Sequence, residues 1–366
     1  MKARAPFDKN FFTEYNTFME LYGKKQIDIR EDNKSAVIDI LLQRESTMLQ
    51  MAERLGLSHT ALAKVVNELR QKNVVQLCAV RDAGAGRPPK VFGVNGDCAI
   101  ACAVLLTSER VYVYYVDMRG FQINKIDTEN TFPDFASLLD FTVAQVHALK
   151  CHPRLEGKIL KNIYIGIPSA RMYGKTFADL GDVAQAAFAE RFPTVRTVVR
   201  RNVDYETVAE SKYGLLSDGK KNALFLNLDE CFCASFFLGG SVYRGDHGMQ
   251  GYDANDGFCG IKRVPDFAAL AEKYAAGERE ATEKVHALLL PAVQKAGALM
   301  RILDIGYAVL GGELQRLGDR FLEVCASHFG ENKSVKYTVM GKDIPAALSG
   351  AVWQSTYATL QDVMVR

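Results

Sequence analysis

The chain has 366 residues, 48% of them hydrophobic and 24% charged, a composition typical of a globular protein with two or three domains. The formal net charge is only +2, with a basic excess in the first 95 residues and a mildly acidic remainder. The N-terminus lacks the apolar core of a secretion signal, and the apolar run Cys98–Leu106 is too short to span a bilayer. These features argue against secreted and membrane classes. They predict a cytoplasmic protein with no membrane partner, whose 8 cysteines are reduced.

Residues 47–72 carry the most informative local pattern in the chain. The apolar residues of a second helix recur there at spacings of three and four: Leu62, Val65, Val66 and Leu69. Gly56 supplies the backbone freedom of a tight turn before this helix, and Ser58 is a suitable N-cap for it. Two short helices joined in this way predict a helix-turn-helix. The exposed face of the second helix is suited to enter a major groove.

The flanking sequence predicts a winged form of this motif. An amphipathic helix over Lys34–Arg44 precedes it, and two β-rich runs, VVQLCAV and KVFGV, follow it around the turn RDAGAGRPP. Arg87 stands between Gly86 and Pro88, where it is placed to reach a phosphate or a narrow minor groove. We therefore predict a winged helix-turn-helix in residues 1–95, with aromatic-rich residues 1–30 as an extra helix. The predicted DNA-binding residues are Ser58, His59, Thr60, Lys64, Asn67 and Arg87. The alternative is a protein-binding module, since trihelical units serve in that role as well.

From Ala99 onward the pattern changes to an α/β type. Two successive units, each with three strands followed by helix, strand and helix, are typical of the two lobes of an actin-like, ribonuclease-H-like ATPase fold. We assign residues 96–366 to this second domain, with lobes of about 96–205 plus the C-terminal helix, and 206–345. The last third is mostly helical. We expect a helix break near Pro291 and a final helix over Ile344–Leu360.

Several motifs, taken in order and spacing, carry a resemblance to a known family. They are the helix-turn-helix with the GRPPK that follows it, GIP (166–168), RNVDYETVAE (201–210), RGDHGMQGYDAND (244–256), YAVLGGEL (307–314) and ALSGAV (347–352). With these motifs the chain resembles the repressor branch of the ROK family, named for repressors, open reading frames and sugar kinases. The resemblance extends from about Asn33 to the end.

The chemistry that the resemblance implies is largely missing from this sequence. Kinases of the family cradle ATP phosphates in glycine-rich turns, but the matching stretches AVLLTSERVYVYYVD and NLDECFCAS contain no glycine. The catalytic carboxylate is replaced by the amide Asn202, and Asp204 would need a shift of register to serve. Of the family's zinc cluster only Cys259-Gly260 remains, and Cys231 and Cys233 read as core residues. We therefore expect no catalytic residues, no cofactor and no metal.

The resemblance also implies a ligand and an assembly. The Glu and His that hold the sugar in the family are replaced by Tyr252 and Asn255, while Asn202 and Asp204 keep some polarity. These four are the predicted ligand-binding residues, for a sugar or sugar phosphate in the cleft between the lobes. A homodimer or higher homo-oligomer on a double-stranded, pseudo-palindromic operator is implied as well. The sequence thus predicts a transcriptional regulator, most simply a repressor, of carbohydrate-related genes. Two alternatives remain open: an ATP-dependent sugar kinase with an appended DNA-binding domain, and a ligand-free constitutive regulator.

Overall fold

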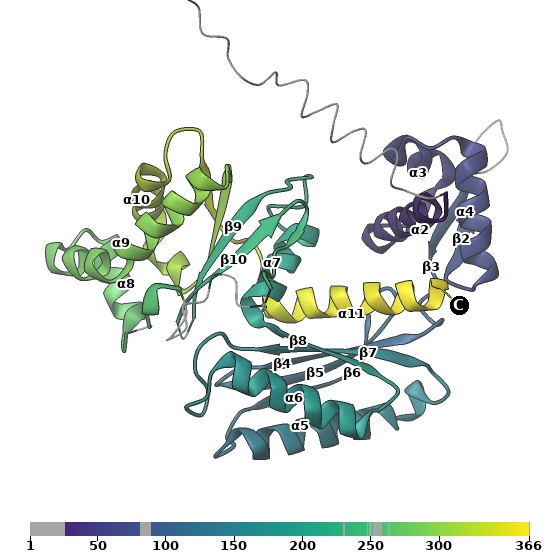
Figure 1. Ribbon diagram of the computed structural model, residues 1–366, viewed down its shortest axis with the longest axis horizontal. Coiled ribbons are helices and arrows are strands. Elements are labelled where there is room, and N and C mark those ends of the chain that lie inside the picture. The colour runs from purple at the N-terminus through teal and green to yellow at the C-terminus, as the bar shows by residue number, and fades with distance from the viewer. Residues whose placement is uncertain are drawn as a thin grey trace, which may run out of the picture. The chain divides into compact units, whose positions relative to one another are not determined.

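The computed structural model describes residues 26–80, 89–229, 231–246, 248, 251, 258–262 and 264–365 (Figure 1). The chain divides into two compact units. Unit 1 holds the described residues up to Cys98 together with those from Leu360 onward, and unit 2 is Ala99–Thr359. The end of the C-terminal helix thus belongs to unit 1. Among the described residues, no helix is both long and apolar enough to cross a membrane.

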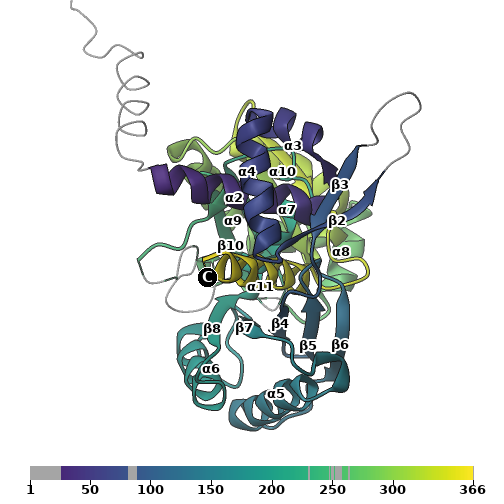
Figure 2. The ribbon, with the colours of Figure 1, turned by 90° about the vertical axis from the view of Figure 1, so that its right-hand side faces the viewer.

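Unit 1 contains three helices and a small antiparallel sheet. The helices are α2 (Gln26–Gln43), α3 (Met48–Leu55) and α4 (His59–Gln71), and the strands, in the sheet order β1-β3-β2, are β1 (Ser46–Thr47), β3 (Lys90–Val94) and β2 (Val75–Val80). Gly56, at φ 65°, ends α3 in the left-handed conformation, which glycine adopts without strain. Figure 2 shows α4 beside the β2–β3 ribbon. This order of elements is that of a winged helix-turn-helix. The predicted extra helix falls largely on residues 1–25, outside the described residues.

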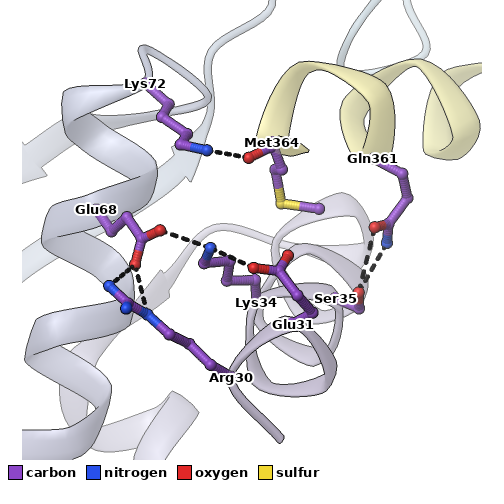
Figure 3. Close-up of polar contacts among 8 residues, drawn as sticks. All are labelled: Arg30, Glu31, Lys34, Ser35, Glu68, Lys72, Gln361 and Met364. Atoms are coloured by element: carbon purple, nitrogen blue, oxygen red, sulfur yellow. Dashed lines mark hydrogen bonds and ion pairs between the residues drawn. The ribbon is translucent and has the colours of Figure 1, made fainter. Parts of the chain in front are cut away.

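Side chains from the end of α11 (Ala346–Val365) complete the packing of unit 1 (Figure 3). The Gln361 side-chain amide donates to Ser35 Oγ on α2 at 2.9 Å. Lys72, at the end of α4, donates to the Met364 carbonyl in the last turn of α11. The final carbonyls of a helix lack intrahelical partners and carry partial negative charge, so a lysine there both satisfies and stabilises them.

An ionic cluster links α2 to α4 beside this contact (Figure 3). Lys34, only 3% exposed, lies 2.5 Å from Glu68 and 2.7 Å from Glu31, while Arg30 lies 2.6 Å from Glu68. Burial acts to lower the pKa of Lys34, but its hydrogen bonds with both carboxylates outweigh burial and raise it. The hydrogen bond from Lys34 lowers the pKa of Glu68. The paired charges therefore hold α2 against the helix that presents the candidate recognition face.

Unit 2 contains two five-stranded mixed sheets with the same topology. The first sheet has the order β6-β5-β4-β7-β8, and its strands are β6 (Gln122–Glu129), β5 (Arg110–Asp117), β4 (Ile100–Leu106), β7 (Leu160–Ile167) and β8 (Arg196–Arg201). The second has the order β11-β10-β9-β12-β13, with β11 (Ser241–Val242), β10 (Phe232–Leu238), β9 (Ala223–Leu228), β12 (Tyr307–Gly312) and β13 (Ser334–Tyr337). In each sheet the first three strands in chain order pair antiparallel, and the last two pair parallel. This repetition confirms the predicted α/β class.

Helices cover the two sheets and enclose separate apolar cores. They are α5 (Phe135–Lys150), α6 (Phe177–Arg191), α7 (Asn202–Tyr213), α8 (Phe267–Ala275), α9 (Arg279–Ile302) and α10 (Gly318–Phe329), with short 3-10 turns at Pro153–Leu155, Phe258–Gly260 and Glu313–Leu317. In Figures 1 and 2, α5 and α6 lie side by side on one face of the first sheet. The predicted break near Pro291 is wrong, because α9 continues through it. Pro291 is exposed, so water can satisfy the carbonyl it leaves without a partner, and the buried face of α9 stays intact.

The first part of α11 packs closely against α7 within unit 2. A Cβ placed on Gly350 would lie 1.9 Å from the Tyr205 carbonyl oxygen, so only glycine permits this approach. Trp353, one turn further along α11, stacks on Tyr357 and lies under the ammonium of Lys212 from α7, 3.9 Å from the ring centroid. These contacts with α11 hold α7 (Asn202–Tyr213) in place, and with it the predicted ligand residues Asn202 and Asp204.

Candidate functional site

The exposed face of α4 in unit 1 presents the predicted DNA-binding residues. The side chains of His59, Thr60, Lys64 and Asn67 are exposed, while the opposite face is buried against the rest of the unit. Ser58 is exposed too, but its hydroxyl accepts a hydrogen bond from the Ala61 backbone N–H at 3.2 Å. Ser58 is therefore the N-cap that the sequence predicted. Arg87 lies outside the described residues.

Unit 2 holds a cavity of about 450 Å³ at the carboxyl ends of its parallel strands. Its walls come from the turn after β4, the loop after β7, the first turns of α7, the end of β9, Gly311–Glu313 after β12, and the start of α11. Sheets of this kind bind ligands outside the carboxyl ends of their strands, and the volume lies within the usual range for small-molecule sites. The cavity is therefore the candidate ligand site of unit 2.

Three polar side chains from two elements form a cluster on its wall, called here the Asn227 cluster. The Asn227 side-chain amide donates to Glu206 Oε2 at 2.6 Å and to Asp229 Oδ2 at 2.9 Å. Glu206 comes from the second turn of α7, and Asn227 and Asp229 come from the end of β9. One amide group thus holds two carboxylates together at the cavity wall.

Burial and like charge both act on Glu206. Burial in the cavity wall raises the pKa of its carboxyl well above the usual value, and the charge of Asp229 raises it further. The hydrogen bond from Asn227 acts in the opposite direction, because it stabilises the charged form. At the cavity wall Glu206 therefore holds its proton more strongly than an exposed glutamate does.

Of the two predicted ligand residues on α7, Asn202 lines the cavity and Asp204 does not. Asn202 lines the cavity, where its side-chain amide donates to the Leu106 carbonyl at 3.1 Å. A Cβ on Gly166 would lie 2.5 Å from Asn202 Oδ1, so the GIP motif makes room for this amide. Asp204 is 5% exposed and is not among the residues that line the cavity. Its carboxylate accepts hydrogen bonds from Arg201 at 2.7 and 3.1 Å and from Ser235 at 2.9 Å, so it holds the fully buried Arg201 in place.

The two cysteines of the C-x-C pair face each other beside the cavity. Cys231 Sγ and Cys233 Sγ are 3.2 Å apart, and both residues belong to a buried apolar cluster with Phe225 and Val309. The hydrogen bond with Cys231 and burial raise the pKa of the Cys233 thiol well above its usual value, which favours the neutral form. In the described part of the chain, no three histidine, cysteine or carboxylate side chains are grouped as metal ligands.

Two predicted ligand residues, Tyr252 and Asn255, lie outside the described residues. Conversely, the sequence reasoning missed Glu206, Asn227 and Asp229. Asparagine and aspartate at the carboxyl end of a buried strand were the signal that could have found this wall.

Comparison of the whole structure with solved structures gives matches over most of the chain. A ROK family transcriptional regulator, described as a homologue of the Escherichia coli Mlc protein, matches with a TM-score of 0.67 and 13% identity, covering 92% of this chain and 99% of that one. The ROK hexokinase from Thermus thermophilus matches with a TM-score of 0.53 and 16% identity, covering 72% of this chain and 99% of that one. A putative N-acetylmannosamine kinase from Listeria monocytogenes matches with a TM-score of 0.50 and 14% identity, covering 70% and 98%. No family model and no curated protein sequence matches the chain. The chain therefore has the ROK fold, which regulators and sugar kinases share.

Proposed function

We propose that this chain of ROK fold is a DNA-binding transcriptional regulator, most simply a repressor, in which unit 1 binds an operator and unit 2 binds a small polar effector without phosphorylating it. The observation that carries the proposal is the exposed face of α4, held in a winged helix-turn-helix arrangement. The regulator match, which spans 92% of the chain, supports the same function. A homodimer on two half-sites follows from the symmetry of such operators.

The residues on α4 suit contact with a duplex. Thr60, Lys64 and Asn67 are spaced by four and three residues, so they share one stripe of the helix. Lysine contacts phosphates or guanine, and asparagine pairs with adenine through two hydrogen bonds. The charge cluster around Lys34 fixes α2 to Glu68, one turn after Lys64 on the flank of the stripe, so the stripe is presented by a rigid element.

The cavity in unit 2 supports binding rather than phosphoryl transfer. The position that the family's base would occupy carries Asn202, whose amide cannot accept a proton at working pH. The turns Thr107–Arg110 and Asn227–Asp229 line the cavity without glycine, and Asp229 places a carboxylate where an ATP phosphate would be repelled. The kinase alternative is supported by Glu206, a carboxylate on the cavity wall with a raised pKa, and by the match to the ROK hexokinase.

The test for DNA binding begins with the full-length protein and a random-sequence duplex library. Repeated selection should enrich one motif with two-fold symmetry. In band-shift titrations on the enriched duplex, Lys64→Ala and Arg87→Ala should each weaken binding by about tenfold, since a specific base or phosphate contact contributes about 1–3 kcal/mol. Lys273→Ala, an exposed lysine on α8, is the matched control and should bind normally.

Two results would overturn the proposal. The first is selection without an enriched motif, or with binding that neither Lys64→Ala nor Arg87→Ala weakens. The second is ADP release when the protein is incubated with ATP, Mg²⁺ and a hexose, provided that Glu206→Gln abolishes it. The ligand-free alternative predicts operator binding that no small molecule alters.

A further inference from the structure

At the Asn227 cluster, the wall of the cavity in unit 2 presents mainly hydrogen-bond acceptors. Both hydrogens of the Asn227 amide group are used, one toward Glu206 and one toward Asp229, so this group has no further donor to offer a ligand. The cluster also presents the carbonyl oxygen of Asn227 and two carboxylates, whose oxygens can each accept more than one hydrogen bond. The cluster is therefore suited to accept hydrogen bonds.

A buried acceptor without a partner points to a ligand at this place. Asn227 is 4% exposed, and its Oδ1 has no hydrogen-bond partner in the described part of the chain. This oxygen faces Gly311 and Gly312 across the cavity wall, and a Cβ on Gly312 would lie only 2.2 Å from it. An unsatisfied buried polar atom destabilises the protein by about 1–3 kcal/mol. A ligand that donated a hydrogen bond to Oδ1 would remove this destabilisation.

The charged side chains around the cavity are mostly acidic. Its described lining residues include four carboxylates, Glu109, Glu206, Asp229 and Glu313, and one guanidinium, Arg110. Arg110 is engaged outside the cluster, where its Nε donates to Asp127 Oδ1 at 2.9 Å, and Glu313 is likewise paired, with Arg316 at 2.8 Å. The cavity is thus a favourable environment for positive charge and an unfavourable one for phosphate.

We infer that the cavity takes a cationic ligand of hexose size, a polyhydroxylated compound whose protonated amine is bound by Glu206, Asn227 and Asp229. This inference rests on the proposed function, of which it names the effector class. An ammonium group has three N–H donors and no acceptor, and the cluster offers three acceptors held together by one amide. The amide side chain of Gln315, elsewhere on the wall, suits the hydroxyl groups of such a ligand.

The protonation of Glu206 adds a measurable consequence. Burial and the neighbouring Asp229 and Cys233 raise the pKa of Glu206, so its carboxyl keeps a proton to higher pH than an exposed glutamate does. A bound ammonium favours the carboxylate, and binding then releases that proton to the buffer. The affinity for the amine accordingly rises as pH increases through the raised pKa of Glu206.

The experiment compares three hexoses of similar size with the full-length protein at pH 7. Glucosamine carries an ammonium, glucose is neutral, and glucose 6-phosphate is an anion. Isothermal titration should show glucosamine binding at least tenfold more tightly than glucose, with no measurable binding of glucose 6-phosphate. Titrations in two buffers of different ionisation enthalpy report the proton released with glucosamine. A fourth arm replaces the amine with 10 mM Mg²⁺ or Ca²⁺, since oxygen acceptors also bind these ions.

Variants decide whether the Asn227 cluster is responsible. Glu206→Gln and Asp229→Asn keep the side-chain shapes and should each reduce glucosamine binding at least tenfold, and Glu206→Gln should abolish proton release. Glu283→Gln, an exposed carboxylate on α9, is the control and should bind as the unaltered chain does. Glucose 6-phosphate binding as tightly as glucosamine would overturn the inference, as would unchanged binding by both cluster variants. Binding of the metal ion without the amine, or of none of the probes, would overturn it as well.

The inference and the proposed function fail separately. Operator selection uses the protein without ligand, and the hexose titrations use it without DNA. A chain that selects an operator but binds no hexosamine remains a regulator with a different effector. A chain that binds glucosamine but selects no DNA has the predicted cavity and lacks the proposed function.

Discussion

Gly350 provides the sharpest test of how unit 2 is packed. A methyl group added there would lie 1.9 Å from the Tyr205 carbonyl oxygen, whereas an ordinary contact begins at 3.4 Å. Because the obstacle is backbone, no rotamer change relieves it, and α11 and α7 would have to separate by about 1.5 Å. Overpacking of this kind costs about 1–3 kcal/mol, and alanine regains about 0.5–1 kcal/mol of helix propensity. The net cost is therefore about 0–2.5 kcal/mol. Because the clash is severe, we expect Gly350→Ala to lower the free energy of unfolding by about 2 kcal/mol, in the upper part of this net range.

A second helical glycine gives the matched control. Gly181 lies inside α6, and the nearest atom to a Cβ there is Val199 Cγ1 at 3.8 Å, an ordinary contact. Gly181→Ala should therefore stabilise the chain by about 0.4–1 kcal/mol, because it restricts the unfolded state without a clash. The same substitution in two helices is thus predicted to act with opposite signs.

The single tryptophan of the chain reports directly on this interface. Trp353 follows Gly350 by one turn, and Lys212 lies over its ring. Thermal unfolding followed by tryptophan emission should show a Tm about 4–8 °C lower for Gly350→Ala and about 1–4 °C higher for Gly181→Ala. Equal shifts in the same direction, or an unchanged Tm for Gly350→Ala, would refute the packing argument.

Three further outcomes are expected. Glu206 has a raised pKa in the folded state, so it stabilises the fold least at high pH; the stability advantage of Glu206→Gln over the unaltered chain should grow in urea titrations as pH rises above about 4.5. Glu68 has a lowered pKa through Lys34, so it contributes stability that is lost in acid; Glu68→Gln should cost about 1–3 kcal/mol at neutral pH, and this cost should shrink as pH falls through the lowered pKa. Ser58→Ala removes the cap on the Ala61 N–H and should destabilise unit 1 by about 1 kcal/mol in the same titrations, whereas an unchanged midpoint would contradict the capping role.

Features set by local sequence could be predicted from the chain alone. The buried face of α4 follows from the spacing of Leu62, Val65 and Leu69, and the cap at Ser58 follows from its place before that run. The order of strands and helices in unit 2 follows from two repeated patterns of alternation and turn residues. These features depend on neighbours within one or two turns of the chain, which a sequence displays directly.

The cavity wall could not be predicted in the same way. Glu206 and Asn227 are 21 positions apart and meet only because α7 packs beside the end of β9. Asp204 has the sequence position expected of a ligand contact, but its side chain turns toward Arg201 and Ser235. Two residues apart on α7, Asp204 and Glu206 point in different directions, and the choice is made by partners distant in sequence.

Because Gln361 and Met364 belong to the packing of unit 1, the candidate DNA-binding unit is discontinuous in the chain. A ribosome makes α2, α3 and α4 first, but their partners on α11 emerge only after all of unit 2 has been translated. Domains otherwise tend to fold as they emerge, N-terminal domain first. An interrupted translation product would therefore carry α2, α3 and α4 without the α11 residues that finish their packing. Under the proposed function, such a fragment would present a DNA-binding unit whose packing is incomplete.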